Sequence, residues 1–177
     1  QMIDHVNMML QEAGHWQLPE GYHKRAHVYI GAESVLTTFD SGSFRNAINL
    51  QFLETLELGQ KKGFLGPDIY VQPRRSCEKV LIGGATSSMS AGYNEVVEIT
   101  VAFRQDEDHS STLNLIFVIL DQLASPLVIG APTMDHLGTV MAPGHLELRY
   151  LDLVLPTFVN GRSLGPLPAV PENESIA

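Results

Sequence analysis

The feature that most constrains the fold is a two-residue alternation in residues 95–103, which read EVVEITVAF. Glu98 and Thr100 share one face of this segment, and four apolar residues share the other: Val97, Ile99, Val101 and Phe103. A period of two is that of a β-strand, because successive side chains of a strand point to opposite faces. The chain therefore needs a sheet with one apolar side.

Other short segments are rich in β-branched and aromatic residues and are bounded by turn residues, which predicts further strands. AHVYIG and SVLTTF, within residues 26–39, predict a hairpin that ends at Asp40. Four more strand segments are predicted in DIYVQP (68–73), EKVLIG (78–83), TLNLIFVIL (112–120) and HLELRYLDLVL (145–155). The nearly continuous apolar run of residues 112–120 indicates a strand that is covered on both faces.

Helical patterns are few and short. Apolar residues recur at helical spacing over residues 2–13, and Gly14 can end that helix. Asn49 can cap a second helix, which buries several leucines and for which Gly59 is the expected stop. A third helix is predicted over residues 131–138, with a proline in its first turn and a glycine at its end. Many short strands with two or three short helices predict a mostly-β fold with a closed sheet.

The chain has 177 residues, 44% of them hydrophobic, which suffices for one globular domain with its own core. We expect an N-terminal helical extension (1–25), one β domain (26–155) and a Pro-rich C-terminal arm (156–177). Eleven basic residues against twenty acidic ones give a formal net charge of −9. This charge opposes binding to a phosphate backbone or to an anionic membrane surface. Neither nucleic acid nor a membrane is therefore an expected partner.

Cysteine usage and the first residues bear on the compartment. The single cysteine, Cys77, leaves no internal disulfide and is typical of a reducing environment. The first residues carry acidic side chains and lack a basic start before a smooth apolar stretch, so no secretory signal is expected. We expect an intracellular, cytoplasmic protein.

The seven histidines are scattered without a His-Glu-x-x-His motif, so neither a metal site nor a cofactor is predicted.

The segment of residues 34–39 runs directly into Asp40, Ser41, Gly42 and Ser43. An aspartate placed where a strand breaks into a tight turn is held by rigid backbone and remains available for chemistry. Gly42 lets the backbone fold close behind it, and the two serine hydroxyls can brace the carboxylate or the turn. Asp, Ser and Gly are also common in ordinary turns between strands, so the tetrapeptide alone leaves both interpretations open.

A second segment, LVIGAPTMDHLG at residues 127–138, strengthens the catalytic interpretation. The pair of segments resembles the retropepsin-like aspartic proteases, in which an apolar strand delivers Asp-Thr/Ser-Gly-Ala/Ser and a late apolar pair followed by Gly opens a helix behind the active site. DSGSFRNAINLQFLETL is similar to the Asp-Ser-Gly-Ala turn and trailing helix of LTR retrotransposon proteases, and LVIGAPTMDHLG to their Leu-Gly-Met-Pro-Trp-Leu segment. The resemblance, over residues 26–138, implies a retropepsin-like acid protease fold that is active as a homodimer.

The resemblance also implies a mechanism for peptide hydrolysis. Two carboxylates share one proton and activate a water between them, because two carboxylates in contact cannot both ionise. The chain has one Asp-Ser-Gly, so the second carboxylate is expected from Asp40 of another copy. Ser41 then reaches across to the other copy's turn, and Ser43 donates to the outer oxygen of Asp40 and favours its ionised form. The expected substrate is a peptide or a polyprotein.

The glycine-rich segment IGGATSSMSAGYN, residues 82–94, lies where the family keeps its flap, a β-hairpin that closes over an extended peptide. The resemblance assigns substrate contacts to residues of this hairpin and of the backing loop: Ile82, Gly83, Gly84, Ala85, Thr86, Met89, Ile129 and Gly130. A plain surface hairpin is the alternative for this segment.

Two residues depart from the retroviral pattern. Retroviral enzymes place Asp directly after the tetrapeptide and Arg after the late Gly, an ion pair that braces the dimer, whereas this chain has Phe44 and Ala131. We expect the brace to come instead from interlocked strands of the C-terminal segment, whose leucines exceed the needs of one small core: Leu146, Leu148, Leu151, Leu153 and Leu155. Two alternatives stay open, a catalytically silent retropepsin-like dimerisation or peptide-binding module and an unrelated β domain.

Overall fold

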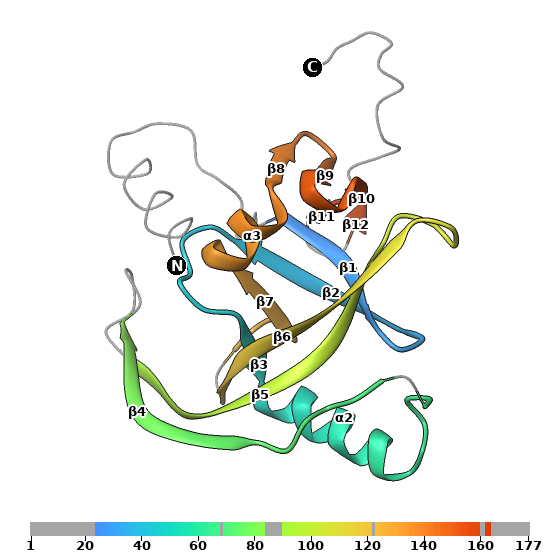
Figure 1. Ribbon diagram of the computed structural model, residues 1–177. Coiled ribbons are helices and arrows are strands. Elements are labelled where there is room, and N and C mark those ends of the chain that lie inside the picture. The colour runs from blue at the N-terminus through green and yellow to red at the C-terminus, as the bar shows by residue number, and fades with distance from the viewer. Residues whose placement is uncertain (1–23, 68, 84–89, 122, 160–161, 164–177) are drawn as a thin grey trace, which may run out of the picture.

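The computed structural model describes residues 24–67, 69–83, 90–121, 123–159 and 162–163 (Figure 1). The longer strands are β1 (Lys24–Ile30), β2 (Glu33–Asp40), β4 (Arg75–Gly83), β5 (Ser90–Arg104) and β6 (Ser110–Leu120). The shorter strands are β3 (Ala47–Asn49), β7 (Leu127–Gly130), β8 (Thr139–Ala142), β9 (His145–Leu148), β10 (Leu153–Pro156), β11 (Phe158–Val159) and β12 (Arg162–Ser163). The predicted helix over residues 2–13 lies outside the described residues.

The strands form one large mixed sheet and one small antiparallel sheet. The large sheet has nine strands in the order β12-β11-β1-β2-β7-β3-β6-β5-β4, and the small one has the order β10-β9-β8. The large sheet closes on itself, because Tyr29 of β1 lies opposite Ala102 of β5. The predicted mostly-β closed sheet is therefore confirmed. The predicted hairpin is present as β1 and β2, which pair from Lys24 opposite Phe39 to Ile30 opposite Glu33.

The core lies inside this closed sheet and confirms the alternation of residues 95–103. The four apolar side chains on one face of β5 are fully buried, while Glu98 and Thr100 on the other face are only half-buried. The two adjoining β strands of the hairpin contribute Val28, Ile30 and Phe39 to the same core. One face of each strand thus faces the interior, which is what a period of two requires.

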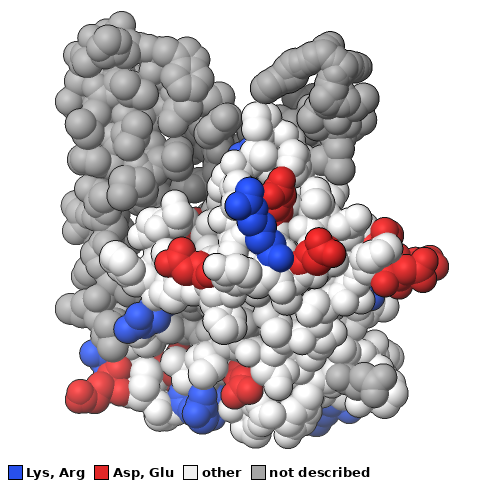
Figure 2. All heavy atoms as spheres, turned by 45° about the horizontal axis from the view of Figure 1, so that its top comes forward, with Lys and Arg blue, Asp and Glu red and all other residues white. Residues whose placement is uncertain are grey.

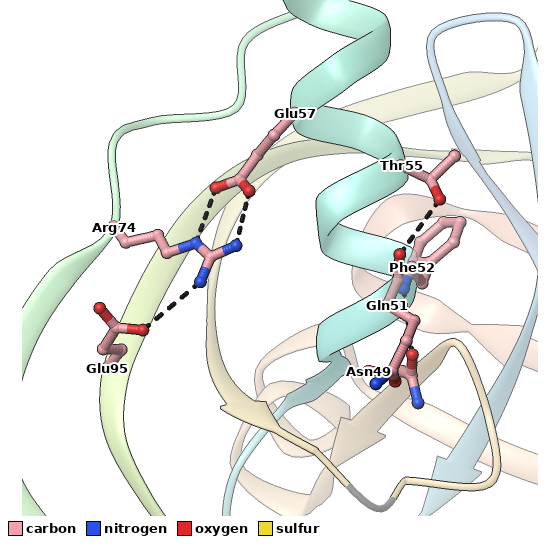
Figure 3. Close-up of polar contacts among 7 residues, drawn as sticks. All are labelled: Asn49, Gln51, Phe52, Thr55, Glu57, Arg74 and Glu95. Carbon is pink, nitrogen blue, oxygen red and sulfur yellow. Dashed lines mark hydrogen bonds and ion pairs between the residues drawn. The ribbon is translucent and has the colours of Figure 1, made fainter.

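Among the described residues, two α-helices accompany the sheets. Helix α2 (Leu50–Lys61) begins where the side chain of Asn49 accepts a hydrogen bond of 3.0 Å from the backbone N–H of Phe52 (Figure 3). The predicted stop at Gly59 is wrong, because the helix continues to Lys61 and the left-handed residue after it is Gly63, at φ 79°. Helix α3 (Ala131–Leu137) ends at Gly138, at φ 64°, as predicted. In the described part of the chain no helix is long and apolar enough to span a membrane.

Two strand predictions need correction. Residues 69–73 form no regular strand and pair with β5 only around the bridge of Val71 to Ile99, where the Gln72 N–H donates to the Glu98 oxygen at 2.9 Å and the Thr100 N–H to the Tyr70 oxygen at 3.3 Å. The backbone N–H and C=O of Val71 bind the side chain of Gln60, so on that edge the segment contacts a side chain and not a strand. The second error concerns β6, which is not covered on both faces. Its residues up to Ile116 alternate with exposed side chains, and only the last four are all buried. Strand β3 pairs with β6 only from Val118 onward, so the first part of β6 lies in the projecting β5–β6 hairpin.

The C-terminal leucines serve the core of the single chain. Leu146, Leu148, Leu153 and Leu155 are each buried to at least 95% in the main core, and a short 3₁₀ turn, η1 (Arg149–Leu151), separates β9 from β10. The expectation that these leucines exceed the needs of one core is therefore wrong. The chain after Pro156 also contributes to the large sheet, because Phe158 of β11 lies opposite Arg25 of β1.

On the face seen in Figure 2, the charged side chains of the described residues are spread out. Figure 2 shows Lys and Arg side chains interspersed with Asp and Glu on one face, with uncharged surface between them. This face therefore presents no broad area of a single sign in the part of the chain that is described.

Candidate active site

Asp40 is the last residue of β2 and lies beside the late glycine of the sequence. Strands β2 and β7 pair in parallel, with Phe39 opposite Ile129 and Asp40 opposite Gly130. Only 4% of the surface of Asp40 is exposed. The two motifs that stand far apart in the sequence are thus joined directly by a strand pair.

The turn after Asp40 fixes the orientation of its carboxylate. The N–H of Ser43 donates to the backbone oxygen of Asp40 at 3.1 Å, and the N–H of Gly42 donates to Asp40 Oδ1 at 2.9 Å. The other oxygen, Oδ2, is buried and has no hydrogen-bond partner among the described residues. A buried carboxylate oxygen without a donor is costly, so it marks a place where a further polar group belongs.

Gly130 forms the back of this turn at very short range. A Cβ atom on Gly130 would lie 2.6 Å from the backbone oxygen of Arg45 and 2.8 Å from that of Ser43. The next residue, Ala131, donates its N–H to the same Ser43 oxygen at 2.7 Å. No side chain fits at position 130 without moving backbone, so the glycine is a steric requirement of the site.

Asn46 is a site residue that the sequence reasoning missed. Its Oδ1 accepts a hydrogen bond of 2.9 Å from the N–H of Gly130, and its Nδ2 donates to Thr133 Oγ1 at 2.8 Å and to the Ile116 oxygen at 3.3 Å. One side chain thereby joins the exit of the Asp40 turn to β7, α3 and β6. These contacts brace the turn within a single chain. The only signal in the sequence was a polar residue directly before the apolar Ala-Ile of β3.

Ser43 makes a different contact from the one predicted. Its hydroxyl donates to the backbone oxygen of Arg45 at 2.7 Å, so the predicted donation to Asp40 is wrong. The reason is local, since a short hydroxyl side chain readily bonds backbone groups two residues away. Ser41 is exposed on the turn, next to the buried Asp40.

The Ser43 contact leads to a prediction. Replacing Ser43 by Ala is expected to lower the free energy of unfolding by about 1 kcal/mol, because the hydroxyl's short bond to the Arg45 oxygen and its longer one from the Arg45 N–H, at 3.4 Å, are both lost. The acidic limb of any pH–activity profile should not move, since the hydroxyl does not touch the carboxylate. Thermal unfolding and a pH series on the same variant measure both effects. A shift of the acidic limb of the pH–activity profile would indicate that Ser43 contacts the Asp40 carboxylate after all.

The hairpin of β4 and β5 adjoins the turn. Its outer arm pairs from Val80 opposite Tyr93 to Gly83 opposite Ser90, and Ile82 and Gly83 lie in this arm. The other predicted hairpin contacts lie outside the described residues: Gly84, Ala85, Thr86 and Met89. Arg45, just beyond the Asp40 turn, donates from Nε to the hydroxyl of Tyr93 at 3.4 Å.

A cavity of about 290 Å³ lies at this junction, between residues of the turn exit, the hairpin, β6 and α3. Phe44 lines it and is 75% exposed. The side chain of Ile129 lies elsewhere, fully buried in the main core, so it contributes to the core and not to a surface that a substrate could reach. Its neighbour Val128, on the opposite face of β7, belongs to a second cluster that includes Tyr93.

The chemistry of the site is that of a carboxylate. Within the described ranges, His, Cys, Asp and Glu form no group of three or more that could hold a metal ion. Asp40 has one N–H donor on Oδ1 and, among the described residues, none on Oδ2, so this carboxylate can take up or release a proton on the Oδ2 side.

Comparison with known structures supports the fold. The chain is similar to the crystal structure of the retroviral protease-like domain of Ddi1 from Leishmania major, with a TM-score of 0.51 over 78% of this chain and 96% of that one. The sequence identity is 14%, a level at which the likeness shows the fold alone. The sequence matches no protein-family profile and no curated protein. The predicted retropepsin-like fold is confirmed, and the finer likeness to LTR retrotransposon proteases rests on sequence motifs.

Proposed function

We propose that the chain is an aspartic endopeptidase in which the Asp40 residues of two copies form the catalytic pair. The observation that carries this proposal is the state of the Asp40 carboxylate, with Oδ1 held by the Gly42 N–H and Oδ2 buried without a donor among the described residues. A second carboxylate that shares a proton would supply the missing donor. We propose that this group comes from another copy, because the sequence has a single Asp-Ser-Gly.

In the proposed reaction the two carboxylates divide the acid and base work. The ionised one removes a proton from a water, whose oxygen attacks the carbonyl carbon of the peptide bond. The protonated one donates to the carbonyl oxygen and stabilises the charge that develops there. Collapse of the intermediate breaks the C–N bond: the leaving amine takes the proton that the first carboxylate removed from water, and the second carboxylate recovers its proton from the intermediate's hydroxyl as the new carboxyl group forms. The products are a new carboxyl terminus and a new amino terminus.

The remaining parts of the site have supporting roles in this proposal. The exposed Ser41 reaches the turn of the other copy, and the β4–β5 hairpin serves as the flap over an extended peptide. The contact of Arg45 with Tyr93 supports the second role, because it places the hairpin next to the turn. A polyprotein is the substrate that a processing role would imply.

A catalytically silent dimerisation or peptide-binding module is the alternative. The absence of the retroviral Asp and Arg at Phe44 and Ala131, and the exposed apolar ring of Phe44, favour it. A binding module would retain peptides without cleaving them. Mass spectrometry of a peptide library after incubation with the chain separates the two functions, since only the protease produces new termini.

The shared site predicts that activity depends on chain concentration. A monomer holds half a site, so the rate per chain should rise with concentration and level off when dimers are saturated. A fluorogenic peptide assay run beside sedimentation across a dilution series measures this. A fully active monomer at high dilution would contradict the shared site.

Mixing provides a second measurement of the same prediction. When subunits exchange, an equal amount of the Asp40→Asn chain should reduce the activity of the wild-type chains to about one half, because only about half of them then meet another intact copy. Unchanged activity after mixing would argue for a complete site in each chain.

A further inference from the structure

Arg74, the residue directly before β4, joins three elements of the fold. Its Nε and Nη2 donate to the two carboxylate oxygens of Glu57 on α2, at 2.8 and 2.7 Å, and its Nη1 lies 3.5 Å from Glu95 Oε1 on β5 (Figure 3). Two parallel hydrogen bonds between guanidinium and carboxylate are among the strong pairs in proteins and fix the direction of both groups. The bonds to Glu57 raise the pKa of Arg74, so the guanidinium stays charged.

A second side chain of α2 holds the same segment. Gln60 Nε2 donates to the Val71 oxygen at 3.0 Å, and the Val71 N–H donates to Gln60 Oε1 at 2.7 Å. On the other side, the N–H of Gln72 donates to the Glu98 oxygen of β5 at 2.9 Å. The chain just before β4 is thus held between α2 and β5, and the base of the hairpin has a defined position.

Beyond this base the ladder between β4 and β5 is interrupted. Arg75 and Ser76 pair with Val96 and Glu95, and regular pairing resumes only at Val80, opposite Tyr93. Residues 77–79 therefore oppose a single residue of β5, a bulge that bends the strand and breaks the hydrogen-bond ladder. On the β4 side the outer arm is connected to the sheet through this irregular segment, whereas β5 (Ser90–Arg104) continues unbroken into the sheet and contacts Arg45 through Tyr93.

We propose that Arg74 is a positioning residue for substrate binding: through Glu57 and Glu95 it fixes the base of the hairpin against α2, so that the hairpin bends at residues 77–79 and its outer arm meets the Asp40 turn in one place. The use of the hairpin in binding peptide rests on the proposed function. The fixation of its base does not, because it is a property of the contacts alone.

Hydrogen exchange of the full chain tests the fixation. In Arg74→Ala, peptides covering residues 70–76 should exchange about tenfold faster than in the wild type, because a charge-assisted pair no longer holds them. Peptides from β2 and β7 should be unchanged. The matched control is Arg149→Ala, which removes an exposed Arg–Glu pair between η1 and β9 (Arg149 Nε to Glu147 Oε1, 3.2 Å) and should leave the exchange of residues 70–76 unchanged.

Two exchange results would overturn the proposal. One is an unchanged rate over residues 70–76 in Arg74→Ala, and the other is an equal acceleration throughout the chain, which would mean general destabilisation. Arg74→Lys is a third variant for the exchange experiment, since it keeps the charge but loses the two parallel hydrogen bonds. It should restore only part of the protection, and full restoration would show that charge alone suffices and that the fork geometry is not needed.

Peptide hydrolysis tests the positioning. Arg74→Ala should raise KM about fivefold and change kcat less than about twofold, because the lost interaction acts on binding and not on the reacting atoms. The positioning role would be rejected if Arg74→Ala had the same KM as Arg149→Ala although its hydrogen exchange over residues 70–76 was faster than in the wild type. If the wild-type chain cleaves no peptide, the proposed function fails, while the exchange measurement still decides whether Arg74 fixes the base.

Discussion

Replacing Asp40 by Asn is expected to abolish peptide hydrolysis while the chain still folds. We expect a loss of at least about 10⁴-fold in kcat/KM, the scale seen when a central catalytic group is removed. The amide keeps an oxygen that can accept from the Gly42 N–H, so the turn retains its hydrogen bond. It cannot share a proton with a second carboxylate, so the acid–base pair is lost. Initial rates with a fluorogenic peptide measure the first effect, and thermal unfolding measures the second.

Asp121→Asn is the matched control for this prediction. Asp121 also follows the end of a strand, β6, but it is exposed and bonds only Gln51, at 3.3 Å from Nε2 to Oδ1, among the described residues. Its replacement should leave the rate within about twofold of the wild type, because most exposed substitutions have small effects. Retained turnover in Asp40→Asn would reject the protease proposal outright, whereas retained peptide binding without turnover in the wild type would favour the silent module.

The second large effect is expected from Gly130→Ala. The new Cβ would meet the backbone oxygens of Arg45 and Ser43 at 2.6 and 2.8 Å, so backbone must move. Overpacking of this kind costs about 3 kcal/mol, which corresponds to a fall in Tm of roughly 6–12 °C for a domain of this size. The backbone that must move belongs to the turn that follows Asp40. A misplacement of about 1 Å costs roughly 100-fold in rate, so we expect the molecules that remain folded to lose activity by about this factor.

Gly59→Ala separates the steric effect from a general effect of adding a methyl group. A Cβ on Gly59 of α2 would only reach ordinary contact with Leu65, at 3.7 Å. Alanine is the better helix former by about 0.5–1 kcal/mol, so this variant should be slightly more stable than the wild type. Calorimetry gives the Tm of both variants. Equal Tm values for Gly130→Ala and Gly59→Ala would show that the backbone behind the Asp40 turn can move aside for a methyl group at little cost.

Sequence patterns predicted those strands and helix ends that are determined by residues close together in the sequence. The alternation of residues 95–103 identified β5, and the cap at Asn49 and the glycine at Gly138 identified one end each of two helices. The partial exposure of β6 could not be predicted, because an apolar run has the same composition whether β3 covers it or it projects in a hairpin. The C-terminal leucines posed the same problem, since composition does not tell a core from an interface.

The candidate site was predicted to a similar extent. Asp40 and Gly130 stand in motifs, and the structure pairs them directly. Asn46 stands in no motif, and its role follows from contacts with Gly130 and Thr133 that exist only in the folded chain. The Ser43 contact was predicted incorrectly because two acceptors lie within reach of a hydroxyl, and only the geometry of the turn chooses between them.

The parallel pairing of β2 with β7 also affects when the site can form during synthesis. The segment with Asp40 leaves the ribosome early, but its partner strand follows only after β3, α2 and the hairpins of β4, β5 and β6. Contacts between such distant segments form late and slowly, because a long loop must close before they are made. We therefore expect a nascent chain that ends before Gly130 to carry the carboxylate without its backing. The order of translation would thus leave the Asp40 turn without its backing until Gly130 has been made.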